Sequence, residues 1–139
     1  MLMNSFSAIF RCGQAFINRH LQHSDITYGE QAILMYLASA EPTNQDSIAR
    51  YFFLDKGAIA KTMSHLEQKQ LIVRSVNPAN QREKLLQLTE QGRAHITEMQ
   101  AAREAWEQCL YEGLSPGEII QLEQITTKIE QNAIRHLRA

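Results

Sequence analysis

The stretch Asp55–Leu71, DKGAIAKTMSHLEQKQL, decides how the chain is interpreted. Ile59, Met63 and Leu66 recur at intervals of four and three residues, which places them on one side of a helix. The other side carries no carboxylate before Glu67 and consists of small, polar and basic residues: Lys56, Gly57, Ala58, Lys61, Thr62 and His65. Such a face suits the wall of a DNA groove. The alternative is a partly exposed helix of any helical domain, and the neighbouring segments decide between the two.

The segments on either side predict a helix-turn-helix followed by a β-hairpin. The run 43–46 offers an N-cap for a short helix, and Asp55 offers one for the central helix. The runs 71–76 and 85–88 are typical of strands, and the sequence 77–81 between them has strong turn chemistry. Arg82 and Lys84 lie close to that turn, so the hairpin resembles a wing that reaches phosphates or the minor groove.

The remaining segments predict long helices. Residues 2–21 form an apolar stripe, Thr27 and Glu30 fit a capping box, Thr89 caps a helix that reaches about Leu110, and Ser115 begins the last helix. We therefore expect a mainly α fold with a small β-hairpin, in which a winged helix-turn-helix is flanked by N- and C-terminal dimerisation helices. The predicted parts of this single domain, 1–139, are 1–22 and 110–139 for dimerisation, 27–92 for the winged helix-turn-helix, and 89–110 for a long connecting helix.

The terminal helices are too apolar to face water along their whole length. Their partner is either the other terminal helix of the same chain or that of a twofold-related second chain. The candidate dimerisation residues are Phe6, Ile9, Phe10, Leu122, Ile125, Ile129, Ile134 and Leu137.

Charge locates the candidate DNA surface in the middle of the chain. The formal net charge of −1 argues against a nucleic-acid partner. Between residues 56 and 84, however, the net charge is +4, because six bases stand against Glu67 and Glu83, whereas the segment from Glu90 onward has a net charge of −3. There is no apolar run long enough to span a membrane, and the two cysteines form no CxxC motif, so we predict a cytoplasmic protein without a membrane partner.

The order of these elements, together with one motif, resembles the MarR family of winged-helix transcription regulators. The motif is Asn80-Gln81-Arg82, then five residues, then Leu88-Thr89-x-x-Gly92. The runs ITYGEQAILMYLA and DKGAIAKTMSHLEQKQLI are similar to the family's second and fourth helices. The resemblance implies a homodimer with interleaved terminal helices, recognition helices in the major groove of a palindromic operator, and a wing arginine in the minor groove. It also implies control by a small phenolic or other aromatic effector, by cysteine oxidation or by a metal.

Two positions depart from the family pattern. Asn80 replaces an aspartate that can hold the wing through a salt bridge, and a neutral hydrogen bond is about half as strong as a charged one. Gln70 replaces the usual glycine after the recognition helix, where a left-handed residue would cost roughly 1 kcal/mol relative to glycine. The resemblance therefore supports wing order and minor-groove contact less strongly than it supports the rest of the fold, and the turn after the recognition helix can differ from the family's.

These patterns predict a double-stranded DNA interface and an effector pocket. Lys61 suits guanine acceptors, Thr62 suits either base and Ala58 suits a thymine methyl group. The full predicted DNA-binding set is Lys56, Ala58, Lys61, Thr62, His65, Arg82 and Lys84. The pocket is expected between the N-terminal helix, the helix from Tyr28 and the long helix after Thr89, although no motif identifies its residues.

Other functions have weaker support in the sequence. There is no catalytic constellation, so no enzyme and no cofactor are expected. His20-x-x-His23 followed by Asp25 could gather metal ligands, but solvated histidines explain it better and no metal site is predicted. Cys12 on the N-terminal helix leaves a redox sensor as an alternative, and so does a winged helix that binds protein.

Overall fold

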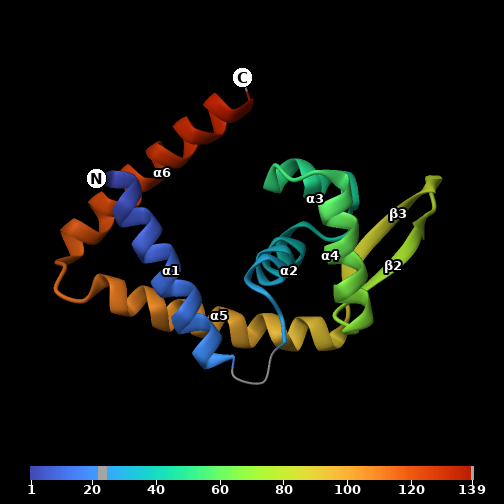
Figure 1. Ribbon diagram of the computed structural model, residues 1–139, viewed down its shortest axis with the longest axis horizontal. Coiled ribbons are helices and arrows are strands. Elements are labelled where there is room, and N and C mark those ends of the chain that lie inside the picture. Colours follow the sequence, from blue (N-terminus) through green and yellow to red (C-terminus); the bar gives the residue numbers. More distant parts are fainter. Residues whose placement is uncertain (22–24, 139) are drawn as a thin grey trace. The chain divides into compact units, whose positions relative to one another are not determined.

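The computed structural model describes residues 1–21 and 25–138. It contains the helices α1 (Leu2–His20), α2 (Tyr28–Ala40), α3 (Gln45–Phe52), α4 (Lys56–Gln68), α5 (Glu90–Tyr111) and α6 (Pro116–Arg138) (Figure 1). The strands are β1 (Thr43–Asn44), β2 (Ile72–Asn77) and β3 (Asn80–Leu88). The predicted mainly α fold with a winged helix-turn-helix is confirmed.

The chain forms two compact units, Met1–Arg103 and Glu104–Ala139. The first holds the helix-turn-helix and the wing, and the second holds the end of α5 and all of α6. The division into dimerisation, connecting and DNA-binding parts stays a prediction. No helix in the described part of the chain is long and apolar enough to cross a membrane.

Side-chain caps fix where the helices begin. The Thr27 hydroxyl accepts from the Glu30 backbone N–H at 3.2 Å, and the Thr27 N–H donates to the Glu30 carboxylate at 3.1 Å. Asn44 caps α3 by accepting from the Ser47 N–H, and Asp55 caps α4 by accepting from the Ala58 N–H, both at 2.8 Å. These caps satisfy N–H groups that have no partner within the helix, so the predicted helix starts were correct.

Two left-handed residues end the helices of the helix-turn-helix. Phe53 follows α3 with φ 55°, and Gln70 follows α4 with φ 60°. Gln70 thus takes the left-handed conformation whose cost relative to glycine the sequence raised. The turn is held by the bond from the Leu71 N–H to the Leu66 carbonyl and by the Thr89 hydroxyl, which donates to the Gln70 carbonyl at 2.6 Å.

The wing belongs to a three-stranded antiparallel sheet of order β1-β3-β2 rather than to a simple hairpin. In the added pair, Thr43 lies opposite Leu86 and Asn44 opposite Leu85. The sequence did not predict β1, because two residues carry no recognisable strand period. The free end of β2 and β3 projects beyond α4 (Figure 1).

The core of the first unit lies where α2, α3, α4 and the start of α5 meet the sheet. Its largest fully buried side chains are Leu34, Leu37, Ile48, Ile59, Met63, Leu66 and Leu86. Gly92 packs directly against the residues that flank the sheet at the edge of this core. A Cβ atom at Gly92 would overlap the Leu71 carbonyl oxygen and lie 3.3 Å from Leu88 Cδ2. The glycine of the wing motif is thus required by close packing.

In the second unit, α6 buries none of its own side chains. A capping box starts it, in which Ser115 N–H donates to the Glu118 carboxylate at 2.8 Å. The Tyr111 hydroxyl contacts Glu107 at 3.4 Å and Glu123 at 3.3 Å.

Candidate nucleic-acid interface

The predicted base-reading residues lie on the outer face of α4. Lys56, Ala58, Lys61 and His65 are exposed, and Thr62 is partly exposed. The opposite face packs into the core through three fully buried residues, Ile59, Met63 and Leu66. The structure therefore places this predicted set together on one accessible surface, and contact with DNA stays a prediction.

Ion pairs divide the six cations of the segment 56–84 into two groups. Lys69 pairs with Glu30 at 2.8 Å, Arg74 pairs with Glu67, and Lys56 makes a loose, exposed pair with Asp46 at 3.4 Å. Lys61, Arg82 and Lys84 have no carboxylate within ion-pair distance among residues 1–21 and 25–138. The unpaired cations are thus on the outer face of α4 and on the wing, where phosphate contact was predicted.

The two cations of the wing share one side of β3. Arg82 and Lys84 are two residues apart and both exposed, so their side chains point to the same face of the strand. Glu83 points to the opposite face, where its carboxylate accepts from Asn77 of β2 at 2.5 Å and from Asn44. Because Asn44 also caps α3, Glu83 ties the wing to the helix-turn-helix.

This arrangement corrects the expectation based on Asn80. The Asn80 side chain accepts from the Arg82 backbone N–H at 3.2 Å and so orders the turn locally. The longer-range hold on the wing comes from Glu83, which the sequence analysis counted only as an acid. The charge-assisted bonds to Glu83 are of the stronger kind that the family's aspartate would supply.

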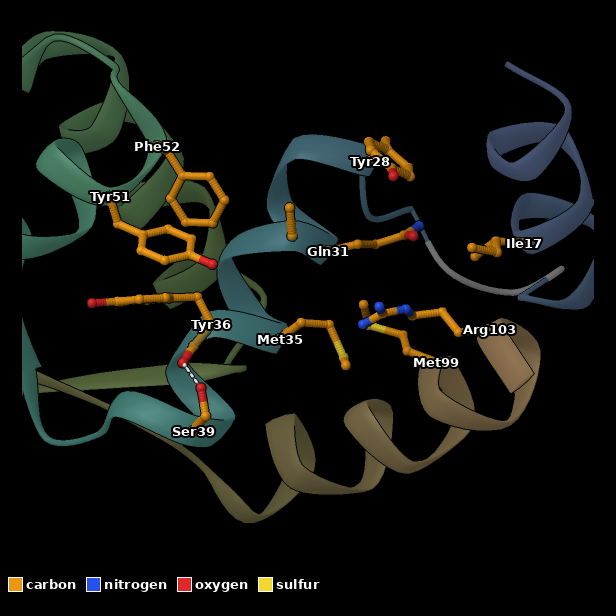
Figure 2. A pocket seen from close by; sticks show the side chains of 11 residues that line it. Ile17, Tyr28, Gln31, Met35, Tyr36, Ser39, Tyr51, Phe52, Met99 and Arg103 are labelled. Carbon is orange, nitrogen blue, oxygen red and sulfur yellow. Dashed lines mark hydrogen bonds between the residues drawn. The ribbon is translucent and has the colours of Figure 1, made fainter. Parts of the chain in front are cut away.

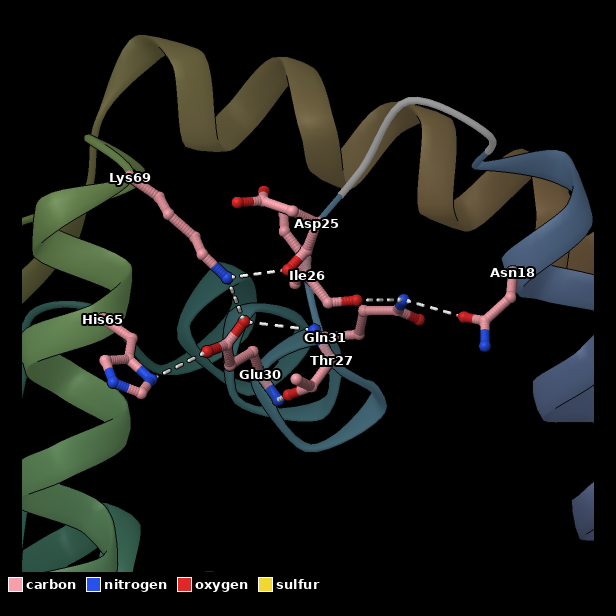
Figure 3. A network of polar contacts seen from close by, with 8 residues as sticks. All are labelled: Asn18, Asp25, Ile26, Thr27, Glu30, Gln31, His65 and Lys69. Atoms are coloured by element: carbon pink, nitrogen blue, oxygen red, sulfur yellow. Dashed lines mark hydrogen bonds and ion pairs between the residues drawn. The ribbon is translucent and has the colours of Figure 1, made fainter.

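A polar network that sequence reasoning missed joins α4 to the start of α2 (Figure 3). The Glu30 side chain is 4% exposed and contacts Lys69 at 2.8 Å and His65 Nδ1 at 3.5 Å. Lys69 Nζ also donates to the Asp25 carbonyl at 2.8 Å. Glu30 was recognised from the sequence only as a capping residue, since its partners are 35 and 39 positions away.

A second part of the network links α1 with α2. The Gln31 side chain is buried and donates to the Ile26 carbonyl at 3.2 Å and to the Asn18 side chain at 3.5 Å (Figure 3). Gln31 therefore connects the N-terminal helix to the segment that starts α2.

A cavity of about 350 Å³ lies within the first unit, between α1, α2, α3 and the middle of α5 (Figure 2). Its wall is rich in aromatic and thioether groups, and the ring centroids of Tyr36 and Tyr51, whose planes are tilted by 36°, lie 4.4 Å apart. Arg103 supplies a cation, and Gln31 and Ser39 supply polar groups. The cavity lies between the three elements expected to form the effector pocket, with α3 added. Its size falls within the range of small-molecule pockets.

The metal and cysteine alternatives gain little from the structure. His23 lies outside the described residues, and within them no cluster of three histidine, cysteine or acidic side chains is arranged to hold a metal ion. Cys12 is free and exposed on α1. Exposure alone does not promote the thiolate that a redox sensor needs.

Comparison with known proteins relates this geometry to one family. The MarR family model matches residues 26–84. A crystal structure of MarR is 30% identical, with 97% of this chain and 92% of that chain covered and a TM-score of 0.87. The MepR chain of the S. aureus MepR–DNA complex is 25% identical, with 95% of this chain and 98% of that chain covered and a TM-score of 0.82. A MarR transcriptional regulator from Methanosarcina mazei Go1 has the same fold at 22% identity, with both chains covered to 96% and a TM-score of 0.88.

Proposed function

The chain belongs to the MarR family of transcription regulators, and from this membership we propose that it represses transcription as a homodimer on a pseudo-palindromic operator. Membership makes it a DNA-binding regulator rather than an enzyme. The similarity to MepR, which was solved bound to DNA, supports the same use of the fold here.

The observation that carries the proposal is the distribution of unpaired cations. Lys61 on α4, and Arg82 and Lys84 on the wing, are left without carboxylate partners in the described structure, while the other bases of the segment are paired. In this arrangement α4 enters the major groove and reads bases with Lys61 and its neighbours. The wing cations then contact phosphates or the adjacent minor groove.

The homodimer is supported by apolar side chains that the single chain leaves uncovered. On α1, Ile9 is 43% exposed and Phe10 is 51% exposed. On α6, Leu122, Ile125 and Leu137 are 41%, 48% and 63% exposed. Large apolar side chains exposed along a helix mark an interaction surface. We assign it to a second copy of the chain, with residues 1–22 and 110–139 as the dimerisation part and half-sites about one helical turn apart.

Control by a small aromatic compound is supported by the cavity. Its tyrosines, Phe52 and two methionines suit a planar ring, and Arg103 suits an acidic substituent. Binding there would bias the separation of the two recognition helices by favouring one arrangement of the dimer over another. The site of action is the cytoplasm, where the chromosomal operator lies.

Selection of genomic fragments by the purified protein tests the function. We expect enrichment of fragments that share a pseudo-palindrome, weaker binding at higher salt, and release of the fragments by some aromatic acids. Light scattering of the free protein should give twice the mass of one chain. A protein that enriches no fragment and shows no salt-dependent shift with genomic DNA would instead be a winged-helix protein-interaction module.

A further inference from the structure

We propose that Glu30 is a positioning residue for DNA recognition, which fixes the rotation of α4 about its own axis without touching DNA. This inference rests on the proposed function, because it assigns to Glu30 control of how α4 presents its outer face. The carboxylate lies at the start of α2; its partner His65 belongs to the last turn of α4, and its partner Lys69 is the C-cap residue of that helix (Figure 3).

Helix capping alone does not explain a buried charge at this position. The chain contains a second capping box, at Ser115–Glu118, and there the glutamate is exposed. A glutamine at this capping position can make the same contact with the backbone. Glu30, in contrast, is 4% exposed, and burying a carboxylate is costly unless cations or donors compensate it. The Lys69 ammonium at the C-cap of α4 supplies that compensation, and the His65 imidazole of α4 lies beside the same carboxylate at 3.5 Å.

The two contacts hold α4 at points one turn apart. His65 and Lys69 are four residues apart, so they lie one above the other on the same side of the helix. The other anchors of α4 are Ile59, Met63 and Leu66, and apolar burial has no directional preference. Ile59, Met63 and Leu66 thus set which face of α4 is buried, and the contacts of Glu30 with Lys69 and His65, together with the bond from Lys69 Nζ to the Asp25 carbonyl, fix the exact rotation of the helix within that burial.

The variant Glu30→Gln distinguishes the positioning of α4 by Glu30 from its capping of α2 and from the general effect of its negative charge on DNA affinity. Gln can keep the bond to the Thr27 N–H, but it removes the charge that pairs with Lys69. Loss of an acid should by itself tighten binding to every DNA. A positioning role predicts the opposite for a specific site. We expect about tenfold weaker binding to the genomic fragment that the wild-type protein selects most strongly, with no loss on a mixed-sequence duplex of equal length.

Two further variants complete the experiment. Thr27→Ala removes the other half of the capping box and should lower thermal stability while leaving the ratio of specific to mixed-sequence affinity at its wild-type value. Lys69→Met leaves the capping box intact and should lower that ratio, as Glu30→Gln does. Lys69→Met decides the question if Glu30→Gln does not fold by circular dichroism.

The outcomes distinguish the two proposals. A wild-type ratio for Lys69→Met, or for a folded Glu30→Gln, would overturn the positioning role while leaving the regulator function intact. A wild-type protein that selects no fragment at all would overturn the regulator function, and the positioning role with it.

Discussion

Replacing Gly92 by alanine should destabilise the fold, although alanine is the better helix former. Gly92 is the third residue of α5, and its N–H donates to the Thr89 hydroxyl at 3.0 Å. A Cβ atom there would overlap the Leu71 carbonyl oxygen and lie 3.1 Å from the Leu71 carbonyl carbon. That oxygen cannot move aside freely, because it accepts the Thr89 backbone N–H at 3.0 Å.

The expected magnitude follows from these contacts. Overpacking a rigid site costs about 1–3 kcal/mol, and loss of the Thr89–Leu71 hydrogen bond adds about 1 kcal/mol. Gly29→Ala is the matched control, because Gly29 is also in the first turn of a helix but a Cβ there meets no atom within 4 Å. Both variants gain the same helix propensity, about 0.5–1 kcal/mol. The difference between them should therefore isolate the clash, at about 2–4 kcal/mol.

Urea unfolding followed by far-ultraviolet circular dichroism measures this difference. Protein concentration must be equal for all variants, because the apparent stability of a dimer depends on it. We expect Gly92→Ala to unfold at distinctly lower urea than the wild type, and Gly29→Ala to unfold at the same concentration or a higher one. Equal midpoints for the two variants would refute the reasoning from close packing.

Four further predictions concern the interface, a turn and a partly buried imidazole. Lys61→Ala should weaken operator binding by ~1–3 kcal/mol in anisotropy titrations, and Arg82→Ala should reduce the slope of log K against log salt by about 1 per subunit. Gln70→Gly should stabilise the protein by roughly 1 kcal/mol in urea unfolding, because Gln70 has φ 60°. Burial lowers the pKa of His95 below 6.5, with Glu98 opposing the shift, so the unfolded chain takes up the proton more readily and stability falls as pH drops below 6.5. His95→Gln should reduce this loss of folding stability below pH 6.5.

Each of these predictions has an outcome that contradicts it. Unchanged operator affinity in Lys61→Ala would remove Lys61 from the interface, and an unchanged salt slope would do the same for Arg82. Gln70→Gly with wild-type stability would show that the left-handed turn carries no strain. The control for His95→Gln is His136→Gln at an exposed position, which should leave the dependence of folding stability on pH below 6.5 as it is in the wild type.

The parts of the fold that depend on neighbouring residues could be predicted from the sequence. Thr27, Asp55 and Thr89 all cap helices through bonds that span three residues, so spacing alone identifies them. The buried face of α4 follows in the same way from helical periodicity.

The parts that depend on contacts between distant residues could not be predicted. The Lys69–Glu30 pair and the Asn44–Glu83 bond each join residues 39 positions apart, and no local pattern records such a contact. The left-handed conformation of Gln70 also depends on a distant residue, because the Gln70 carbonyl accepts from the Thr89 hydroxyl, 19 positions further along the chain.

Three of the six cations between residues 56 and 84 are paired with carboxylates, and this pairing lowers the affinity of the protein for DNA of arbitrary sequence. In the proposed dimer, the two unpaired wing cations of each subunit give a slope of log K against log salt of about −4, which is modest for a DNA-binding dimer. Random chromosomal sequence would then sequester few copies at physiological salt, so a small cellular pool could keep a matching operator occupied.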